Sequence, residues 1–127
     1  MIERLSPPGI AAPRGPYSPA VRAGDFIFVS GQVPVDPTTQ QMVLSDIRGE
    51  TRLVLSNVKA ILEGAGASMS DVVKCSVFLM EASDFAGMNE VYSEFFGEAK
   101  PARSTVVVKF AAPGMKVEID CIAYKPK

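Results

Sequence analysis

The segment from Asp46 to Ala65 has the clearest periodicity in the sequence and predicts an amphipathic α-helix. Its apolar residues recur at helical spacing, whereas its charged residues fall elsewhere around the helical wheel. Asp46 is a suitable N-cap, and Gly64 or Gly66 is a suitable end for the helix. A helix with one apolar face has to bury that face, so this segment requires a second layer of structure.

Further segments predict one more helix and several strands. The second helix is expected from Ser83 or Asp84 to Phe96, before Gly97. Its expected apolar stripe consists of Phe85, Met88, Tyr92, Phe95 and Phe96. Runs of β-branched and aromatic residues predict strands at 25–32, 71–80, 103–110 and 116–124, with strand fragments at 33–43 that extend the start of the sheet. The first twenty residues contain five prolines and predict an extended, irregular arm.

The order of these segments predicts an α+β fold, in which a mixed six-stranded sheet carries both helices on one face. The 127 residues suffice for one domain, spanning 1–127. Strand 71–80 is apolar on both sides, since one side carries Val73, Cys75, Val77 and Leu79 and the other Val72, Ser76 and Phe78. The helices cover only one face, so we expect the other face to pack against further copies of the chain.

Composition excludes several classes of protein. The 13 basic and 14 acidic residues are scattered along the chain, which argues against a nucleic-acid surface. No apolar stretch reaches the ~20 residues that span a bilayer, and the N-terminal segment lacks the apolar core of a signal peptide, so a cytoplasmic protein without a membrane partner is expected. The chain has no histidine, which removes Ser-His-Asp and Cys-His catalysis and the common zinc sites. Cys75 and Cys121 lie in apolar runs and are expected to stay unlinked.

The stretch PARSTVVV, residues 101–108, places a charge at the mouth of an apolar strand. Arg103 and Thr105 point to the same side of that strand, and Glu118 and Asp120 share one side of the last strand. The charge of Arg103 is compensated by a structural acid, by a backbone carbonyl, or by a ligand with its own negative charge. The sequence leaves open whether Arg103 meets an acid of the last strand, and whether it does so within one chain or between chains.

Six short segments together resemble the successive blocks of the RidA/YjgF family of reactive-intermediate deaminases. They are GPYSPA, FVSGQ followed by P, NV in the first predicted helix, MNEVYSEFF, PARSTV and VEIDCIA. The resemblance covers nearly the whole chain, from about Arg4 to Tyr124. PARS and VEID are the specific blocks, and their occurrence in this order strengthens the resemblance.

The resemblance implies a chorismate-mutase-like fold assembled as a homotrimer, with the sheets facing inward and three clefts between subunits. It also implies hydrolysis of enamines and imines such as 2-aminoacrylate to 2-keto acids and ammonia, without metal or cofactor, as by a 2-iminobutanoate/2-iminopropanoate deaminase. By position, Arg103 resembles the arginine that holds the substrate carboxylate, and Glu118 the acid that positions water. The positions that resemble cleft-lining, substrate-binding residues are Tyr17, Ser30, Gly31, Asn89 and Thr105. Many relatives have cysteine at Thr105, so reactive-thiol behaviour is not carried over.

The chemistry of these residues agrees with the resemblance and leaves alternatives open. A guanidinium can hold a carboxylate by two hydrogen bonds, and one carboxylate can orient water and transfer protons. The same pocket would serve a non-catalytic sensor or protective protein that binds small carboxylates. Glu118 favours catalysis, because a second anion does not help a pure carboxylate binder. A nuclease or translation inhibitor directed at RNA is disfavoured by the charge balance.

Overall fold

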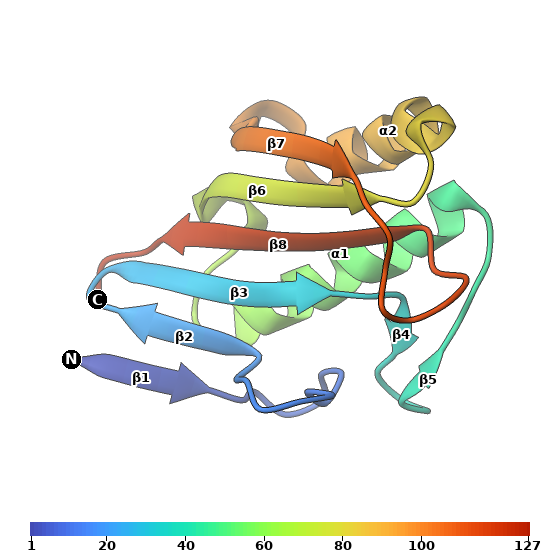
Figure 1. Ribbon diagram of the computed structural model, residues 1–127. Helices are drawn as coiled ribbons and strands as arrows, with labels where there is room; N and C mark the ends of the chain where they lie inside the picture. Colours follow the sequence, from blue (N-terminus) through green and yellow to red (C-terminus); the bar gives the residue numbers. More distant parts are fainter.

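A six-stranded mixed sheet forms the centre of the protein, and both α-helices cover the same face of it (Figure 1). In this computed structural model, which describes residues 1–127, the strands lie in the order β1-β2-β3-β8-β6-β7. Only β6 and β7 are parallel neighbours. The strands are β1 (Ile2–Leu5), β2 (Ala20–Ala23), β3 (Phe26–Gln32), β6 (Val72–Leu79), β7 (Ala102–Val107) and β8 (Val117–Tyr124). The predicted α+β architecture is confirmed.

The two helices begin and end close to the positions that the sequence predicts. The helix α1 spans Ile47–Gly64, and the side chain of Asp46 caps it by accepting a hydrogen bond from the Gly49 amide at 2.8 Å. The helix α2 spans Phe85–Phe96 and is followed by Gly97 at φ 53°, in the left-handed region that glycine tolerates. Short 3₁₀ turns occupy Met69–Asp71 (η1), Ala82–Asp84 (η2) and Gly97–Ala99 (η3).

The N-terminal residues differ from the prediction of an irregular arm. Residues Ile2–Leu5 form the edge strand β1, which pairs antiparallel with β2, and only the proline-containing stretch between these strands is irregular. The first proline, Pro7, follows β1. The prolines of the first twenty residues therefore do not interrupt the backbone hydrogen bonds of that strand. A strand of four residues is also too short to give a clear alternation.

The strand fragments predicted in segment 33–43 are present, but they do not extend the main sheet. The two fragments, β4 (Val35–Asp36) and β5 (Gln41–Met42), pair with each other in a separate ribbon. The hairpin partner of β3 is therefore β2. A turn around Pro37 joins the two fragments, and the Asp36 carboxylate accepts a hydrogen bond there from the Thr38 amide at 2.8 Å.

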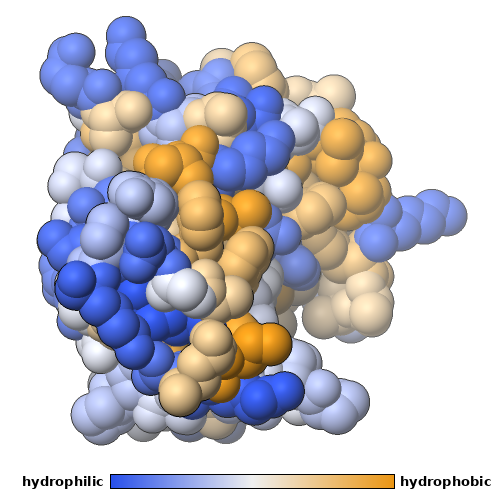
Figure 2. All heavy atoms as spheres, turned by 90° about the vertical axis from the view of Figure 1, so that its left-hand side faces the viewer, coloured by the Kyte–Doolittle hydropathy of each residue, from blue (hydrophilic) through white to orange (hydrophobic).

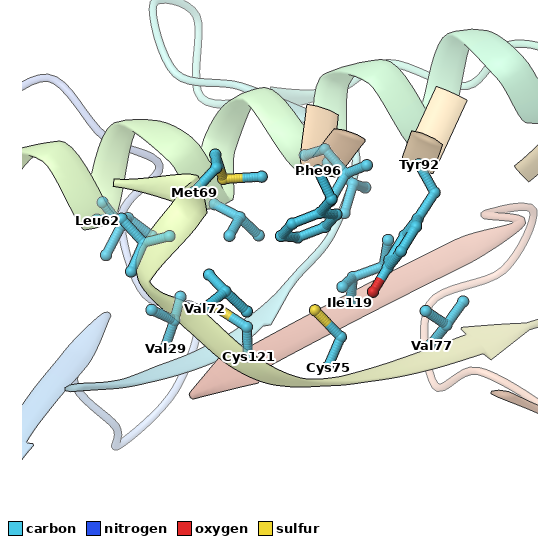
Figure 3. Close-up of a cluster of buried hydrophobic side chains, with 14 of the residues drawn as sticks. Val29, Leu62, Met69, Val72, Cys75, Val77, Tyr92, Phe96, Ile119 and Cys121 are labelled. Atoms are coloured by element: carbon cyan, nitrogen blue, oxygen red, sulfur yellow. The ribbon is translucent and has the colours of Figure 1, made fainter. Parts of the chain in front are cut away.

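The core lies between the helices and the sheet (Figure 3). Tyr92 and Phe96 point from α2 toward β6 and β8, where Cys75 and Cys121 occupy directly opposite positions. Both cysteines are free, as predicted, and burial raises the pKa of the Cys75 thiol to about 11.

The predicted alternation of β6 fails at its first residues. Because Cys75 and Val77 are buried, a strict alternation would bury Val73 and expose Val72. In the structure Val72 is buried and Val73 is exposed. The cause is a shift in the register between β6 and β8 at this point, which moves the first residues of the strand to the other side.

The face of the sheet opposite the helices, here named the open face, is covered by no other element of the chain. It carries the apolar side chains of Phe26, Phe28, Phe78, Val106, Ile122 and Tyr124. Phe28 and Val106 are 43% and 46% exposed, although such residues usually lie inside a protein. Figure 2, a view from the left-hand side of Figure 1, shows apolar side chains at the surface between polar ones.

Neither α1 nor α2 has the length and apolar composition that a helix needs to cross a bilayer.

Candidate active site

The candidate site residues form two separate groups within one chain. Tyr17, Ser30, Gly31 and Glu118 line one cavity of about 500 Å³, here named the acid cavity. Asn89 and Arg103 line a second cavity of about 340 Å³ between α2 and the start of β7, here named the arginine cavity. Thr105 does not line it, but lies two residues further along β7, on the same side of the strand as Arg103.

The two groups are separated by the topology of the sheet. Strand β6 lies between β7 and β8, so the strands that carry Arg103 and Glu118 are not neighbours in the sheet. Glu118 alternates with the buried residues Val117 and Ile119 and therefore points to the open face. Arg103 points to the helix-covered face, where it contacts α2. Arg103 therefore forms no ion pair with Glu118 or Asp120 inside one chain.

Arg103 rests on aromatic and sulfur groups of α2. Its guanidinium carbon lies 4.7 Å from the ring centre of Tyr92 and 5.6 Å from that of Phe85, and its Nη1 lies 4.0 Å from the sulfur of Met88. These contacts attract the cation without using most of its N–H groups. Phe85, predicted as part of the apolar stripe, is 46% exposed and serves this contact in place of the core. The guanidinium remains available to an anion.

Glu118 faces a bulge in β3 that brings the backbone close to its carboxylate. Ser30 and Gly31 together oppose Asp120 alone, because the register between β3 and β8 shifts by one residue there. A Cβ atom on Gly31 would collide with Oε2 of Glu118 and would lie 3.0 Å from its Cδ. The carboxylate accepts no hydrogen bond from the chain. Burial, followed by the nearby charge of Asp120, raises the pKa of Glu118.

Ser30 holds the proline-containing arm against the sheet, and Tyr17 fixes the conformation of the arm itself. The Ser30 hydroxyl donates a hydrogen bond to the Ser18 carbonyl at 2.6 Å, and the Ser30 amide donates to the Pro19 carbonyl at 3.0 Å. The Tyr17 hydroxyl accepts a hydrogen bond from the Arg14 amide at 3.1 Å. Ser30 thus shapes the acid cavity by fixing the arm, since its only proton is already donated.

Glu50, which no motif in the sequence marks, supports one wall of the acid cavity. Its fully buried carboxylate accepts hydrogen bonds from the Lys116 amide at 2.7 Å and the Ser45 amide at 3.1 Å. The Lys116 ammonium lies 3.4 Å from the same carboxylate. The neighbouring Met115 lines the cavity, so Glu50 ties this wall to α1. An acid in the first turn of a helix is usual, and only the structure reveals the contact.

Two basic residues near the site were also missed. Arg14 lines the acid cavity, and its position directly before the GPYSPA block was the only signal in the sequence. Lys100 lines the arginine cavity and has a left-handed backbone, with φ 39°. No group of three or more His, Cys, Asp or Glu side chains is placed to hold a metal ion.

Comparisons with known proteins agree on one family. Residues 9–125 match the family described as Endoribonuclease L-PSP. A RutC family protein of Pyrococcus horikoshii is 54% identical, with 89% of this chain and 90% of that protein covered. A 2-iminobutanoate/2-iminopropanoate deaminase of Dermatophagoides farinae is 42% identical, with 93% and 92% covered. The crystal structure of Escherichia coli TdcF with bound serine superposes with a TM-score of 0.89 at 39% identity, covering 97% of this chain and 98% of TdcF.

Proposed function

This chain belongs to the RidA/YjgF family, which the Endoribonuclease L-PSP description covers, and we propose that it hydrolyses 2-enamines and 2-imines to 2-keto acids and ammonia without a cofactor. The observation that carries the proposal is the division of the site between two surfaces. An arginine without an acidic partner lies at one, and a glutamate without a hydrogen-bond donor lies at the other. The arginine can bind the carboxylate of a substrate, and the glutamate can transfer protons to it, so a complete site needs both surfaces.

A homotrimer would complete the site. In a cyclic assembly through the open face, the arginine cavity of one subunit meets the acid cavity of the next. The exposed apolar residues of the open face, together with Val107 at 55% exposure on the edge strand β7, support such burial. The homotrimer explains in one step why the open face is apolar and why the two halves lie apart.

Arg103 binds the substrate carboxylate in this proposal. Its planar guanidinium matches the two oxygens of a carboxylate, and a charge-assisted hydrogen bond contributes about 1.5–3 kcal/mol. The rings of Tyr92 and Phe85 fix the plane of the guanidinium. Asn89 lines the same cavity at the carboxylate end of the substrate, and Thr105 lies two residues further along β7, on the same side as Arg103.

Glu118 transfers protons at the reacting carbon. The enamine first tautomerises to the imine, and Glu118 then accepts a proton from water as the water oxygen bonds to carbon. The imine nitrogen takes up this proton, which gives the carbinolamine. Glu118 then carries the hydroxyl proton of the carbinolamine to nitrogen, the C–N bond breaks as the C=O bond forms, and the products are ammonia and the keto acid. A raised pKa suits a group that must accept and return a proton near neutral pH. Tyr17, Ser30 and Gly31 line the space for the water and the substrate side chain.

The proposal is tested with a dehydratase that releases 2-aminoacrylate or 2-iminobutanoate in the presence and absence of this protein. Faster release of the keto acid is expected, and Glu118→Gln should abolish it while leaving keto-acid binding in calorimetry unchanged. A protein that binds the keto acid but never accelerates its release is a carboxylate-binding sensor or protective protein. The 13 basic residues form no run along the sequence, which supports a small-molecule substrate over RNA.

A further inference from the structure

Arg14 is a cation without an ion-pair partner that lines the cavity containing Glu118. Its guanidinium donates one hydrogen bond, from Nη2 to the Gln40 carbonyl at 2.8 Å, and forms no ion pair. Four of its five N–H groups are therefore not used by the chain. A neutral imino acid carries one carboxylate, for which Arg103 already suffices.

The acid cavity, which Arg14 helps to line, is mostly apolar. It is lined by Val33, Met42, Phe110, Ala111, Ala112 and Met115. Its volume of about 500 Å³ lies in the range of sites that hold much larger ligands than a three-carbon imino acid. The cavity thus offers room for an extended side chain whose methylene groups contact apolar walls and whose end meets a cation.

The backbone around Arg14 is held in place although the side chain is exposed. The Arg14 amide donates to the Tyr17 hydroxyl, and the Ala12 amide donates to the Gln40 side chain at 2.8 Å. Gln40 in turn donates to the carbonyls of Ile10 and Pro37. The Gln40 bonds attach the arm to the β4-β5 ribbon on the N-terminal side of Arg14, and the Tyr17 bond constrains the arm on its C-terminal side. A preorganised cation loses less conformational entropy when it binds an anion.

We propose that Arg14 binds a second carboxylate on the substrate, so that the protein prefers dicarboxylic 2-imino acids such as 2-iminoglutarate. The inference rests on the proposed deaminase function and names the substrate class of the same site. Without Arg14, a second anion would approach the negative charge of Glu118 unopposed. With Arg14, the cation offsets that repulsion and orients the side chain away from the reacting carbon.

Calorimetry with two keto acids of the same shape tests the inference. One is 2-oxoglutarate, and the other is 5-methyl-2-oxohexanoate, in which an isopropyl group replaces the distal carboxylate. The wild-type protein should bind 2-oxoglutarate more tightly. Arg14→Gln should weaken 2-oxoglutarate binding about 10-fold, the lower end of the range for a charge-assisted hydrogen bond, and should leave the analogue within about 2-fold.

Two further variants serve as controls. Arg4→Gln removes the same charge from an exposed position on β1 that lines no cavity, and should change neither affinity. Lys100→Gln removes a cation from the arginine cavity, and should weaken both keto acids by a similar factor. Equal affinities of the wild-type protein for the two keto acids, or an equal loss for both in Arg14→Gln, would overturn the role of Arg14.

Turnover separates this inference from the proposed function. The ratio of kcat/KM for 2-iminoglutarate to that for 2-iminobutanoate, each generated in place by an amino-acid oxidase, should fall about 10-fold in Arg14→Gln. Hydrolysis of 2-iminobutanoate without any preference for 2-iminoglutarate contradicts the inference and leaves the deaminase function standing. Failure to hydrolyse either imine contradicts the function itself.

Discussion

The guanidinium of Arg103 lies over the ring of Tyr92, 4.7 Å from its centre, while the Tyr92 hydroxyl is buried without a hydrogen-bond partner. The ring face therefore matters to Arg103, whereas the hydroxyl does not. Tyr92→Phe should keep turnover near the wild-type rate and should not lower the melting temperature, because it removes only an unsatisfied polar group. A large loss of turnover with an intact fold would instead give the hydroxyl a role in the chemistry.

Phe85→Leu removes one of the two aromatic rings that contact the Arg103 guanidinium, and leaves the other, Tyr92, in place. Because Phe85 is 46% exposed, the fold should lose little stability. A cation–π contact of about 0.5–1 kcal/mol corresponds to a rise in KM of roughly 2- to 5-fold, with kcat less affected. Steady-state kinetics and a melting curve on the same sample check this. An unchanged KM would show that Tyr92 alone holds the guanidinium.

Arg103→Lys separates a ligand-binding arginine from a structural one. Lysine keeps the charge but loses the planar pair of N–H groups, so turnover should fall at least 10-fold. The melting temperature should stay within about 2 °C, because Arg103 forms no ion pair in the chain. A variant that melts several degrees earlier, yet turns over normally in the cold, would restore the structural interpretation.

Gly31→Ala should damage the site through a direct collision with Glu118. Overpacking of this kind costs about 1–3 kcal/mol, so the melting temperature should drop by several degrees and turnover should be largely lost. Glu118→Asp in the same chain shortens the acid and should recover the melting temperature but not the turnover. If Gly31→Ala alone melts at the wild-type temperature, the bulge of β3 accommodates the added Cβ atom, and the expected collision with Glu118 does not occur.

The pH dependence of turnover should follow Glu118. A carboxylate acts as a base only when ionised, so turnover should fall as the pH drops through its pKa, and this fall should begin at a higher pH than for an ordinary glutamate. Asp120→Asn removes the like charge and should move the acid limb of the pH–rate profile to lower pH. An exposed control, Asp25→Asn, should leave the profile in place.

The stability effect of the same group has a defined sign. Because the pKa of Glu118 is raised in the folded chain, the protonated form is favoured there. Its contribution to the free energy of unfolding is therefore complete below the unfolded pKa and is lost as the pH rises through the folded pKa. Melting curves of Glu118→Gln should lack this part of the pH dependence.

Mixing two inactive variants tests whether the site spans two chains. Homotrimers of Arg103→Lys and of Glu118→Gln should both be inactive. Trimers that form from an equal mixture after unfolding and refolding should recover up to about a quarter of the wild-type turnover, because half of the arginines and half of the glutamates are intact and combine at random. No recovery in verified mixed trimers would place the complete site within one chain.

The sequence predicts the two helices well because their caps and periodicity are local signals, as Asp46 and Gly97 illustrate. The resemblance supplies the residues of the candidate site, but not their separation into two cavities. The register of a strand and the identity of its neighbours depend on pairings distant in the chain, so nothing local reveals that β6 lies between Arg103 and Glu118. For the same reason Arg14 and Glu50 could not be recognised: their partners lie 26 and 66 residues away.

The placement of Arg103 and Glu118 on opposite faces of one sheet has a consequence for how the proposed activity would depend on amount. A newly made subunit would carry no complete site, however well it had folded. Catalysis would begin only when subunits met, so specific activity would rise with protein concentration and decline on dilution below the dissociation constant of the assembly. Synthesis level would then set not only how many sites exist but whether each chain contributes to one.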